Sequence, residues 1–338
     1  MIAGGGGAGR RPGRAVGILG TGSFAPDRVL TNEDLARMVD TSDEWITART
    51  GIKTRRIADD QTATSDLAAE AGRRAIADAK IDPDEIDMII VATATPDMLF
   101  PASACFVQSA LGLKRACAFD VSAACSGFLY SLSIANALIS CGTYGKILVI
   151  GAETLSKIVD WTDRNTCVLF GDGAGAAVLG EVEDGRGIRS VLLGSDGTLS
   201  HWLNMPGGGS RTPISHEVVD QKLHYVKMNG NNVFKYAVKA METAALAALD
   251  QAGARPEDVD LLVPHQANLR IIEAVSERIG VPMTKVFVNL DRYGNTSAAS
   301  VPIAFDEAKR EGRLNRGDLV EAVVFGGGFT WGAAVLRW

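Results

Sequence analysis

The sequence predicts an α/β fold made of two similar halves, because two internal repeats run in the same order along a chain of alternating helices and strands. The first repeat relates Ala75–Val91 to Ala248–Val263, and both copies read as helix, Pro-containing turn and apolar strand. The second relates Phe170–Leu179 to Phe325–Leu336, with two extra residues in the later copy. Repeats this far apart indicate a duplicated α/β unit and exclude a solenoid, whose period is much shorter.

Short apolar runs bounded by turn residues predict the strands, and longer amphipathic stretches predict the helices. The strands of the first half are expected at Val16–Leu19, Ile86–Ala92, Ala116–Asp120, Lys146–Gly151 and Ala176–Leu179. Those of the second are expected at Ser190–Gly194, Val259–Val263, Val286–Asn289, Val320–Phe325 and Ala333–Arg337. The helices are expected at Ser65–Ala79, Ser126–Ser140, Val233–Ala252, Leu269–Ile279 and Ser297–Glu311. This alternation predicts mixed or parallel sheets covered by helices.

The charged turn Glu181–Arg186 predicts the boundary between an N-terminal half, residues 15–183, and a C-terminal half, residues 184–338. Residues 1–14 are glycine-rich, contain three arginines and lack the apolar middle of a secretory signal, so we expect a disordered tail. Capping-box spacing at Thr31 and at Thr41 predicts two short helices. The polar, Gly- and Pro-containing stretch Ser195–His216 predicts a functional loop.

Composition limits the possible functions. The formal net charge of −6 argues against nonspecific nucleic-acid binding, and no apolar run is long enough to cross a bilayer. Five scattered cysteines in apolar surroundings favour a reducing cytoplasm over a disulfide framework. Three of the histidines share one region without the spacing of metal ligands, so we expect no metal site.

Cys125 stands where a buried strand gives way to small residues and then to a helix. A thiol at a helix N-terminus is favoured as thiolate, and small neighbours would admit an acyl thioester. The alternative is a buried structural cysteine, which is the commoner role for a cysteine taken alone and the one we assign to Cys105, Cys117, Cys141 and Cys167.

His265 and Asn295 each follow a predicted strand of the second half, where α/β folds place their ligands. Taken singly, the histidine could be a hydrogen-bonded surface residue and the asparagine a capped turn. Their shared placement at strand exits, together with Cys125, favours one site. The glycine run around Gly327 could supply a backbone amide that joins the Cys125 amide in an oxyanion hole, although a plain turn is the alternative.

These features together resemble the β-ketoacyl-[acyl carrier protein] synthase III family of the thiolase-like superfamily, from about Ala15 to Trp338. The motifs that carry the resemblance are Thr41–Ile46, Ala123–Phe128, Phe170–Ala176, His265–Asn268, Gly294–Ser297 and Gly326–Gly332. The resemblance implies a thiolase-like five-layer α-β-α-β-α fold and a homodimer.

The resemblance also implies a chemistry. Cys125 would take an acyl group from an acyl-CoA, with acetyl-CoA as the expected starter, and no cofactor would be needed beyond this CoA thioester substrate. Malonyl-[acyl carrier protein] would then lose carbon dioxide while His265 and Asn295 hydrogen-bond its thioester oxygen. The carbanion would attack the acyl group in a decarboxylative Claisen condensation that initiates fatty acid biosynthesis.

By the same resemblance, Trp45 and Arg164 would sandwich the CoA adenine, Arg49 and Asn268 would hold the CoA arm, and Phe100 would lie near the acyl pocket. A core tryptophan and a solvated arginine are the simpler interpretations of the first pair.

Lys235 and Arg270 would belong to a basic patch that docks the acidic carrier protein, although both could equally be solvated surface residues. A patch of this kind is needed because a net-negative molecule otherwise repels an acidic partner.

Several other classes of protein share part of this pattern. A thiolase would carry a second cysteine in Gly326–Gly332, and an elongating synthase would use two histidines; neither pattern occurs here. A papain-like hydrolase would need the motif C-G-[SA]-C-[WY], which is absent. A synthase III-like acyltransferase or starter synthase of a specialised polyketide pathway keeps the same three residues and stays open, as does a non-catalytic CoA-binding scaffold.

Overall fold

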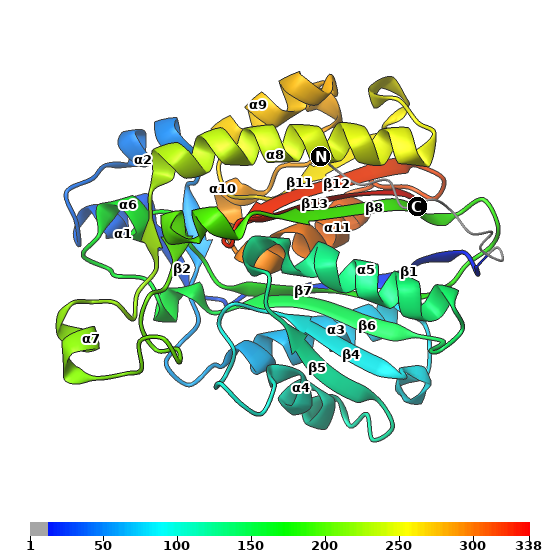
Figure 1. Ribbon diagram of the computed structural model, residues 1–338, viewed down its shortest axis with the longest axis horizontal. Coiled ribbons are helices and arrows are strands. Elements are labelled where there is room, and N and C mark those ends of the chain that lie inside the picture. Colours follow the sequence, from blue (N-terminus) through cyan, green and yellow to red (C-terminus); the bar gives the residue numbers. More distant parts are fainter. Residues whose placement is uncertain (1–12) are drawn as a thin grey trace.

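The computed structural model describes residues 13–338, which form five stacked layers of helices and sheets (Figure 1). One sheet has the strand order β1-β7-β6-β4-β5. Its strands span Val16–Phe24 (β1), Gly173–Glu181 (β7), Ile147–Glu153 (β6), Met88–Ala92 (β4) and Cys117–Val121 (β5). β4 runs parallel to β5 and β6, whereas β7 runs antiparallel to β6 and β1.

The second sheet has the order β11-β12-β13-β8. These strands span Leu261–Pro264 (β11), Leu319–Gly326 (β12), Thr330–Arg337 (β13) and Gly187–Ser195 (β8). β11 is parallel to β12, and the other two pairings are antiparallel.

Helices fill the layer between the sheets and cover both outer faces. The middle layer holds Gly127–Ser140 (α5) and Ser300–Arg310 (α11), and the outer layers hold Thr64–Ala79 (α3), Ser103–Leu111 (α4), Gly230–Ala252 (α8) and Leu269–Ile279 (α9). Among residues 13–338, no helix is both long and apolar enough to span a bilayer. The five-layer α-β-α-β-α architecture expected from the sequence is therefore confirmed.

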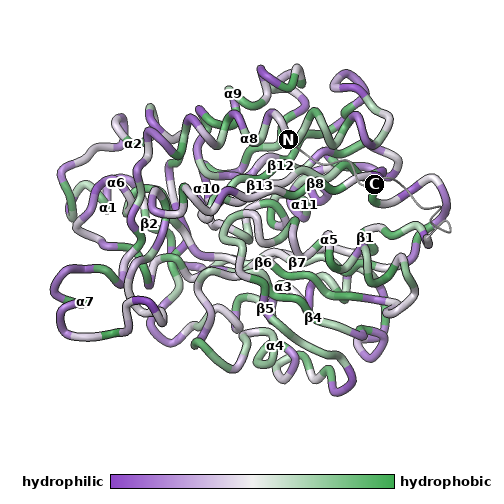
Figure 2. The backbone as a smooth tube through the Cα atoms, viewed as in Figure 1, coloured by the Kyte–Doolittle hydropathy of each residue, from purple (hydrophilic) through white to green (hydrophobic). Residues whose placement is uncertain are grey.

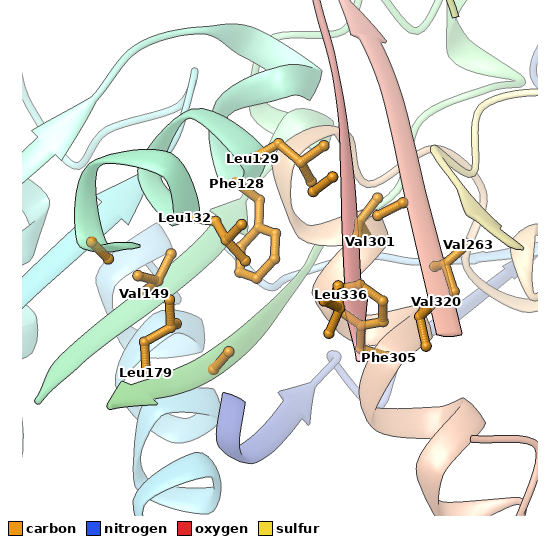
Figure 3. Packing of buried hydrophobic residues seen from close by; sticks show 14 of the residues in the cluster. Phe128, Leu129, Leu132, Val149, Leu179, Val263, Val301, Phe305, Val320 and Leu336 are labelled. Atoms are coloured by element: carbon orange, nitrogen blue, oxygen red, sulfur yellow. The ribbon is translucent and has the colours of Figure 1, made fainter. Parts of the chain in front are cut away.

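Three apolar clusters bind the layers together, and Figure 2 shows the hydrophobic residues gathered along the strands. The central cluster joins the two sheets through α5 and α11, and Figure 3 shows Phe128 and Phe305 reaching toward each other within it. Their ring centroids are 6.4 Å apart in an edge-to-face arrangement, and both side chains are buried. The two halves of the chain are thus joined by a continuous core.

The duplication is visible in the topology. The helix–turn–strand repeat forms α3, a short 3₁₀ turn at Pro83–Glu85 and β4, and it recurs as α8, a turn at Pro256–Asp258 and β11. The order β8-β13-β12-β11 matches β1-β7-β6-β4. The loop between β7 and β8 is the segment where the sequence predicts the boundary between the halves.

The predicted strand Val286–Asn289, which would have matched β5, is wrong. Val286 makes a single bridge to Leu262. Beyond it the Gln266 side chain replaces the strand ladder, because its Nε2 donates to the Phe287 carbonyl (3.1 Å) and its Oε1 accepts from the Asn289 amide (3.0 Å).

Two short helices lie near the N-terminus, as predicted: Asn32–Ala36 (α1) and Asp43–Thr50 (α2). A capping box closes the start of α1, with Thr31 accepting from the Asp34 amide. The predicted cap at Thr41 is wrong by one residue, since the Ser42 hydroxyl accepts from the Trp45 amide. The strands before and after these helices, Val29–Thr31 (β2) and Thr54–Arg56 (β3), pair as a two-stranded antiparallel sheet.

The remaining elements are short. They are Arg164–Cys167 (α6), Leu203–Asn204 (β9), His216–Asp220 (α7), Lys227–Met228 (β10), Leu290–Tyr293 (α10) and the 3₁₀ turns η2 (Ala124–Ser126), η3 (Leu155–Lys157), η4 (Gly197–Trp202), η6 (Met283–Lys285) and η7 (Ser297–Ala299). Most of the expected tail 1–14 lies outside the described residues. Arg14, however, is held by its amide to the Ser140 carbonyl and by its side chain to Glu181, so the expectation of disorder is wrong there.

Candidate active site

Cys125 lies in η2, directly between β5 and the start of α5. The preceding residue, Ala124, has φ of +45°, a left-handed conformation that costs a non-glycine residue energy and that recurs at functional sites. Burial raises the pKa of the Cys125 thiol to about 12, and a hydrogen bond from the Ser297 side chain opposes this rise. The helix N-terminus is expected to lower the pKa of the thiol, but burial of the thiol raises that pKa by more.

His265 follows β11 and is fixed from two sides. Its backbone amide donates to the Val323 carbonyl of β12 (2.8 Å), and its Nδ1 shares a 2.7 Å hydrogen bond with the Ser300 hydroxyl of α11. Burial lowers the pKa of the imidazole to about 4, so the ring is neutral at pH 7. With Nδ1 engaged, Nε2 is the nitrogen available to a ligand.

Asn295 lies between α10 and η7 and is tied to the first half of the chain. Its amide donates to the Leu169 carbonyl (2.8 Å), its carbonyl accepts from Gly171 (3.0 Å), and it forms a bridge with Phe170. The side-chain Oδ1 accepts from the Ser297 amide at 2.8 Å. This bond leaves the Nδ2 group as the hydrogen-bond donor for a ligand.

These three side chains line one cavity of about 560 Å³. Cys125 comes from the first half of the chain, and the other two come from the second. A thiol, a neutral imidazole and a carboxamide donor around one space can bind and polarise a thioester, because each offers a nucleophile or a donor to a carbonyl group.

A second, mostly apolar cavity of about 200 Å³ also reaches Cys125. Its wall includes Leu155, Ile158, Leu203, Met205 and Val226. Apolar walls beside a nucleophile fit a short hydrocarbon chain, because both surfaces leave water on contact and few polar groups of the wall lose hydrogen bonds to water.

The turn between β12 and β13 packs closely against Cys125. A Cβ atom on Gly326 would lie 2.7 Å from the Cys125 backbone nitrogen, so only glycine allows this approach. Gly327 lines the second cavity next to Cys125. The Thr330 hydroxyl links the turn to η2, because it contacts the carbonyls of both Ala123 (3.0 Å) and Gly327 (3.1 Å).

Trp45 and two arginines lie at the mouth of the larger cavity. The guanidinium carbons of Arg49 and Arg164 lie 4.4 and 4.9 Å from the centroid of the Trp45 indole. A flat ring held between Trp45 and Arg164 would need about 7 Å, twice the usual van der Waals spacing. The expected adenine sandwich therefore requires Arg164 to swing away from the indole and from Asp40, to whose carbonyl it donates at 2.7 Å.

The other predicted contacts fall into two groups. Asn268 and Arg270 line the larger cavity, although the Asn268 side chain already caps α9 through the Arg270 amide (2.9 Å) and donates to the Arg49 carbonyl (3.1 Å). Lys235 is exposed on α8, and Phe100 is 83% exposed; neither lines either of the two cavities described above.

Sequence reasoning missed Glu153 and gave Ser297 no role of its own. Glu153 ends strand β6, is fully buried and accepts hydrogen bonds from the Ala94 amide and the Thr95 hydroxyl, whereas Ser297 lines the second cavity together with Cys125. The place of Glu153 at a strand exit is the signal that singled out His265 and Asn295, and the same criterion could have found it.

Comparison with known proteins places this geometry in a family. The sequence matches the family described as 3-Oxoacyl-[acyl-carrier-protein (ACP)] synthase III over residues 119–197 and its C-terminal family over residues 249–338. It is 60% identical to the β-ketoacyl-[acyl-carrier-protein] synthase III of Caldanaerobacter subterraneus, covering 96% of this chain and 98% of that protein. The corresponding protein of Desulfitobacterium hafniense (strain Y51) is 57% identical over the same shares.

Solved structures support the same family assignment. The 3-oxoacyl-[acyl-carrier-protein] synthase III of Aquifex aeolicus superposes with a TM-score of 0.89 at 49% identity, covering 96% of this chain and all of that one. A priming β-ketosynthase of the R1128 polyketide pathway gives 0.89 at 37% identity, covering 97% and 98%. The chain belongs to the β-ketoacyl-[acyl-carrier-protein] synthase III family of thiolase-like acyltransferases, which act in fatty acid biosynthesis.

Proposed function

We propose that this enzyme joins an acetyl group from acetyl-CoA to malonyl-[acyl carrier protein] through an acyl-Cys125 intermediate. The observation that carries the proposal is the single cavity lined by Cys125, His265 and Asn295. The sulfur attacks the thioester carbonyl, and the CoA thiolate leaves. The amides of Cys125 and Gly327 stabilise the oxyanion that forms in between.

The second half-reaction uses the neutral imidazole. Malonyl thioester loses carbon dioxide, and negative charge develops on its carbonyl oxygen. His265 Nε2 and Asn295 Nδ2 donate hydrogen bonds to that oxygen. For Nε2 to carry the proton, Nδ1 must accept from the Ser300 hydroxyl, with which it shares its 2.7 Å bond.

Labelling tests the intermediate. Radioactive acetyl-CoA should label the wild-type enzyme and fail to label Cys125→Ala. Cys167→Ala is the matched control, because Cys167 is also a buried free cysteine but lines neither cavity. A labelled Cys125→Ala protein, or an unlabelled wild type, would contradict the proposal.

The starter is tested with a panel of acyl-CoA thioesters and malonyl-[acyl carrier protein]. Identities of 60% and 57% to β-ketoacyl-[acyl-carrier-protein] synthases III, against 37% to the polyketide priming synthase, favour the fatty acid pathway. We expect acetoacetyl-[acyl carrier protein] as product. Transfer to a different acceptor, without this product, would favour the specialised pathway.

We also propose that the enzyme is a homodimer that pairs through β5. This strand is an edge of the five-stranded sheet, and edge strands bind a second strand readily. The segment just before α4 exposes two large apolar side chains, Leu99 at 84% and Phe100 at 83%. Light scattering should give twice the chain mass, and Leu99→Asp with Phe100→Asp should give a monomer; a wild-type monomer would refute the pairing.

A further inference from the structure

A buried cation beside the site has no part in the chemistry derived above. Arg55 lies in the middle of β3 and is 0% exposed. No carboxylate within residues 13–338 pairs with its guanidinium group, which donates to uncharged oxygen atoms instead. Burial lowers the pKa of Arg55 to about 10, so the group is still charged at pH 7. Burying a cation without an anion is costly, which points to a function for this residue.

The guanidinium group of Arg55 joins two segments that are far apart in the sequence. Its Nη1 donates to Asn32 Oδ1 (2.8 Å) and to the Leu30 carbonyl (3.3 Å), whereas its Nη2 donates to the Val168 carbonyl (2.7 Å). The rigid planar fork of an arginine holds its acceptors at a fixed separation, which a single ammonium on a flexible stem does not. Arg55 therefore fixes the chain at Val168 relative to β2 and the start of α1.

The chain that follows Val168 carries the backbone of Asn295. The Leu169 carbonyl accepts from the Asn295 amide (2.8 Å), and the Gly171 amide donates to the Asn295 carbonyl (3.0 Å). Val168 also lines the larger cavity together with the Asn295 side chain. Both backbone hydrogen bonds of Asn295 thus lie close in sequence to the one carbonyl that Arg55 holds.

Arg55 also packs against this pairing. A Cβ atom on Gly171 would lie 3.0 Å from the Arg55 Cβ, and one on Gly294 would lie 3.3 Å from it. Both distances are shorter than ordinary contact, so the two glycines allow β3 to lie directly against the paired segments. Gly294 has φ of +65°, a conformation that favours glycine, and it immediately precedes Asn295. Packing and a hydrogen bond from Arg55 therefore act on the same short stretch of backbone.

Asn32 anchors the other end of the guanidinium group. Its Nδ2 donates to Asp43 Oδ1 (2.8 Å) and to the Ile52 carbonyl (2.8 Å), while its Oδ1 accepts from Arg55. Asp43 begins α2, the helix that carries Trp45 to the mouth of the larger cavity. The carboxamide of Asn32 thus lies between a cation and an anion, and this holds Arg55 in place independently of the segment at Val168.

We propose that Arg55 is a positioning residue that directs the Asn295 carboxamide toward the thioester oxygen of the malonyl substrate. This inference rests on the proposed function, in which Asn295 Nδ2 donates to that oxygen. Arg55 lines neither cavity, so it acts through the backbone of residues 168–171. A misplacement of about 1 Å at a reacting centre can cost on the order of 10²-fold in rate. Acylation of Cys125 depends instead on amides in η2 and in the turn between β12 and β13.

Arg55→Lys tests the proposal, because it keeps the charge and replaces the fork by one ammonium group. We would measure Cys125 labelling at saturating acetyl-CoA, and carbon dioxide release from malonyl-[acyl carrier protein]. Acylation should stay within about threefold of wild type, whereas decarboxylation should slow by about 10- to 10²-fold. Arg186→Lys is the matched control, because Arg186 also donates to a backbone carbonyl, that of Trp338, but lines neither cavity. Equal loss of both half-reactions in Arg55→Lys would show a general structural role and overturn the proposal.

A double-mutant cycle tests whether Arg55 acts through Asn295. Asn295→Ala removes one donor and leaves the one from His265, so a residual decarboxylation rate remains to be measured. Adding Arg55→Lys to this variant should slow decarboxylation by less than about twofold, because the carboxamide that Arg55 positions is already absent. A further loss as large as in the wild-type background would overturn the proposal.

Hydrogen exchange of substrate-free enzyme gives a readout that does not need the reaction. Amides in peptides that cover residues 168–171 and 293–297 should exchange faster in Arg55→Lys than in wild type, whereas those of α3 should not change. If Arg55→Lys fails to fold, Arg55→Met decides the matter by the same measurements, because it buries no charge. Unchanged exchange in the folded variants overturns the positioning role.

These measurements also separate the two proposals. A wild type that releases no carbon dioxide, with faster exchange in the Arg55 variants, refutes the proposed function only. An active wild type whose losses from Arg55→Lys and Asn295→Ala multiply refutes the role of Arg55 only.

Discussion

Gly326→Ala should disable the site by adding one methyl group. The new Cβ would lie 2.7 Å from the Cys125 nitrogen, 3.0 Å from the Ser126 nitrogen and 3.2 Å from the Cys125 Cα, all of them backbone atoms. Ordinary contact begins near 3.4 Å, so β12 and η2 must separate by about 0.7 Å. Both segments are buried, and overpacking of this kind typically costs about 1–3 kcal/mol, which corresponds to roughly 1–4 °C in melting temperature for a chain of this length.

The loss of rate should exceed what the loss of stability explains. The methyl group would crowd the amide that is proposed to bind the oxyanion, and losing one such donor costs about 10²–10³ in rate. We would follow Cys125 acylation with labelled acetyl-CoA at a temperature where the variant is folded. Gly197→Ala is the control, because a Cβ there meets no atom within 4 Å. An unchanged melting temperature together with an acylation rate within about twofold of wild type for Gly326→Ala would refute the reasoning.

Three other predictions follow from the charged and polar groups. Glu321 is buried without a hydrogen-bond partner among residues 13–338, and burial raises its pKa to about 8, so the folded state keeps a proton that the unfolded state loses near pH 4.5. Stability should therefore fall as pH rises from about 4.5 to 8, by up to about 1.4 kcal/mol per unit, and Glu321→Gln should flatten this slope in denaturant titrations; an unchanged slope would contradict the burial argument. His265→Ala should keep acylation of Cys125 but lose malonyl decarboxylation, measured as carbon dioxide release, and equal loss of both would show a different role. Lys235→Glu should weaken carrier-protein binding in a salt-dependent way and leave acylation by CoA thioesters intact, whereas Arg270→Glu should impair both because Arg270 also lines the cavity; salt-independent binding would argue against electrostatic docking.

Local patterns in the sequence were sufficient to predict the layered fold. Apolar runs and turn residues are properties of neighbouring residues, and they located the strands of both repeated units apart from Val286–Asn289. That segment has the composition of a strand, but the Gln266 side chain takes over the hydrogen bonds that a strand would make. Gln266 lies about 20 residues from the backbone groups that it binds. Its effect therefore cannot be predicted from the residues of the segment itself.

The site was harder to predict because its electrostatics depend on burial. A helix N-terminus beside Cys125 is readable in the sequence, but the desolvation that raises the thiol pKa arises only when both sheets close around it. Glu153 was missed for the same reason. The hydroxyls and amide that hold it come from residues 93–95, about 60 positions away.

The division of the site between the two halves gives the duplication a functional consequence. Cys125 and Glu153 belong to the first half, and His265, Asn295 and Ser297 belong to the second. The halves meet in backbone contacts at the site itself, where Asn295 bridges to Phe170. The thiol and the donors for the thioester oxygen therefore come together only when α5 and α11 pack between the sheets, so the strained conformations at Ala124 and Ser297 are held by the same core that holds the protein together.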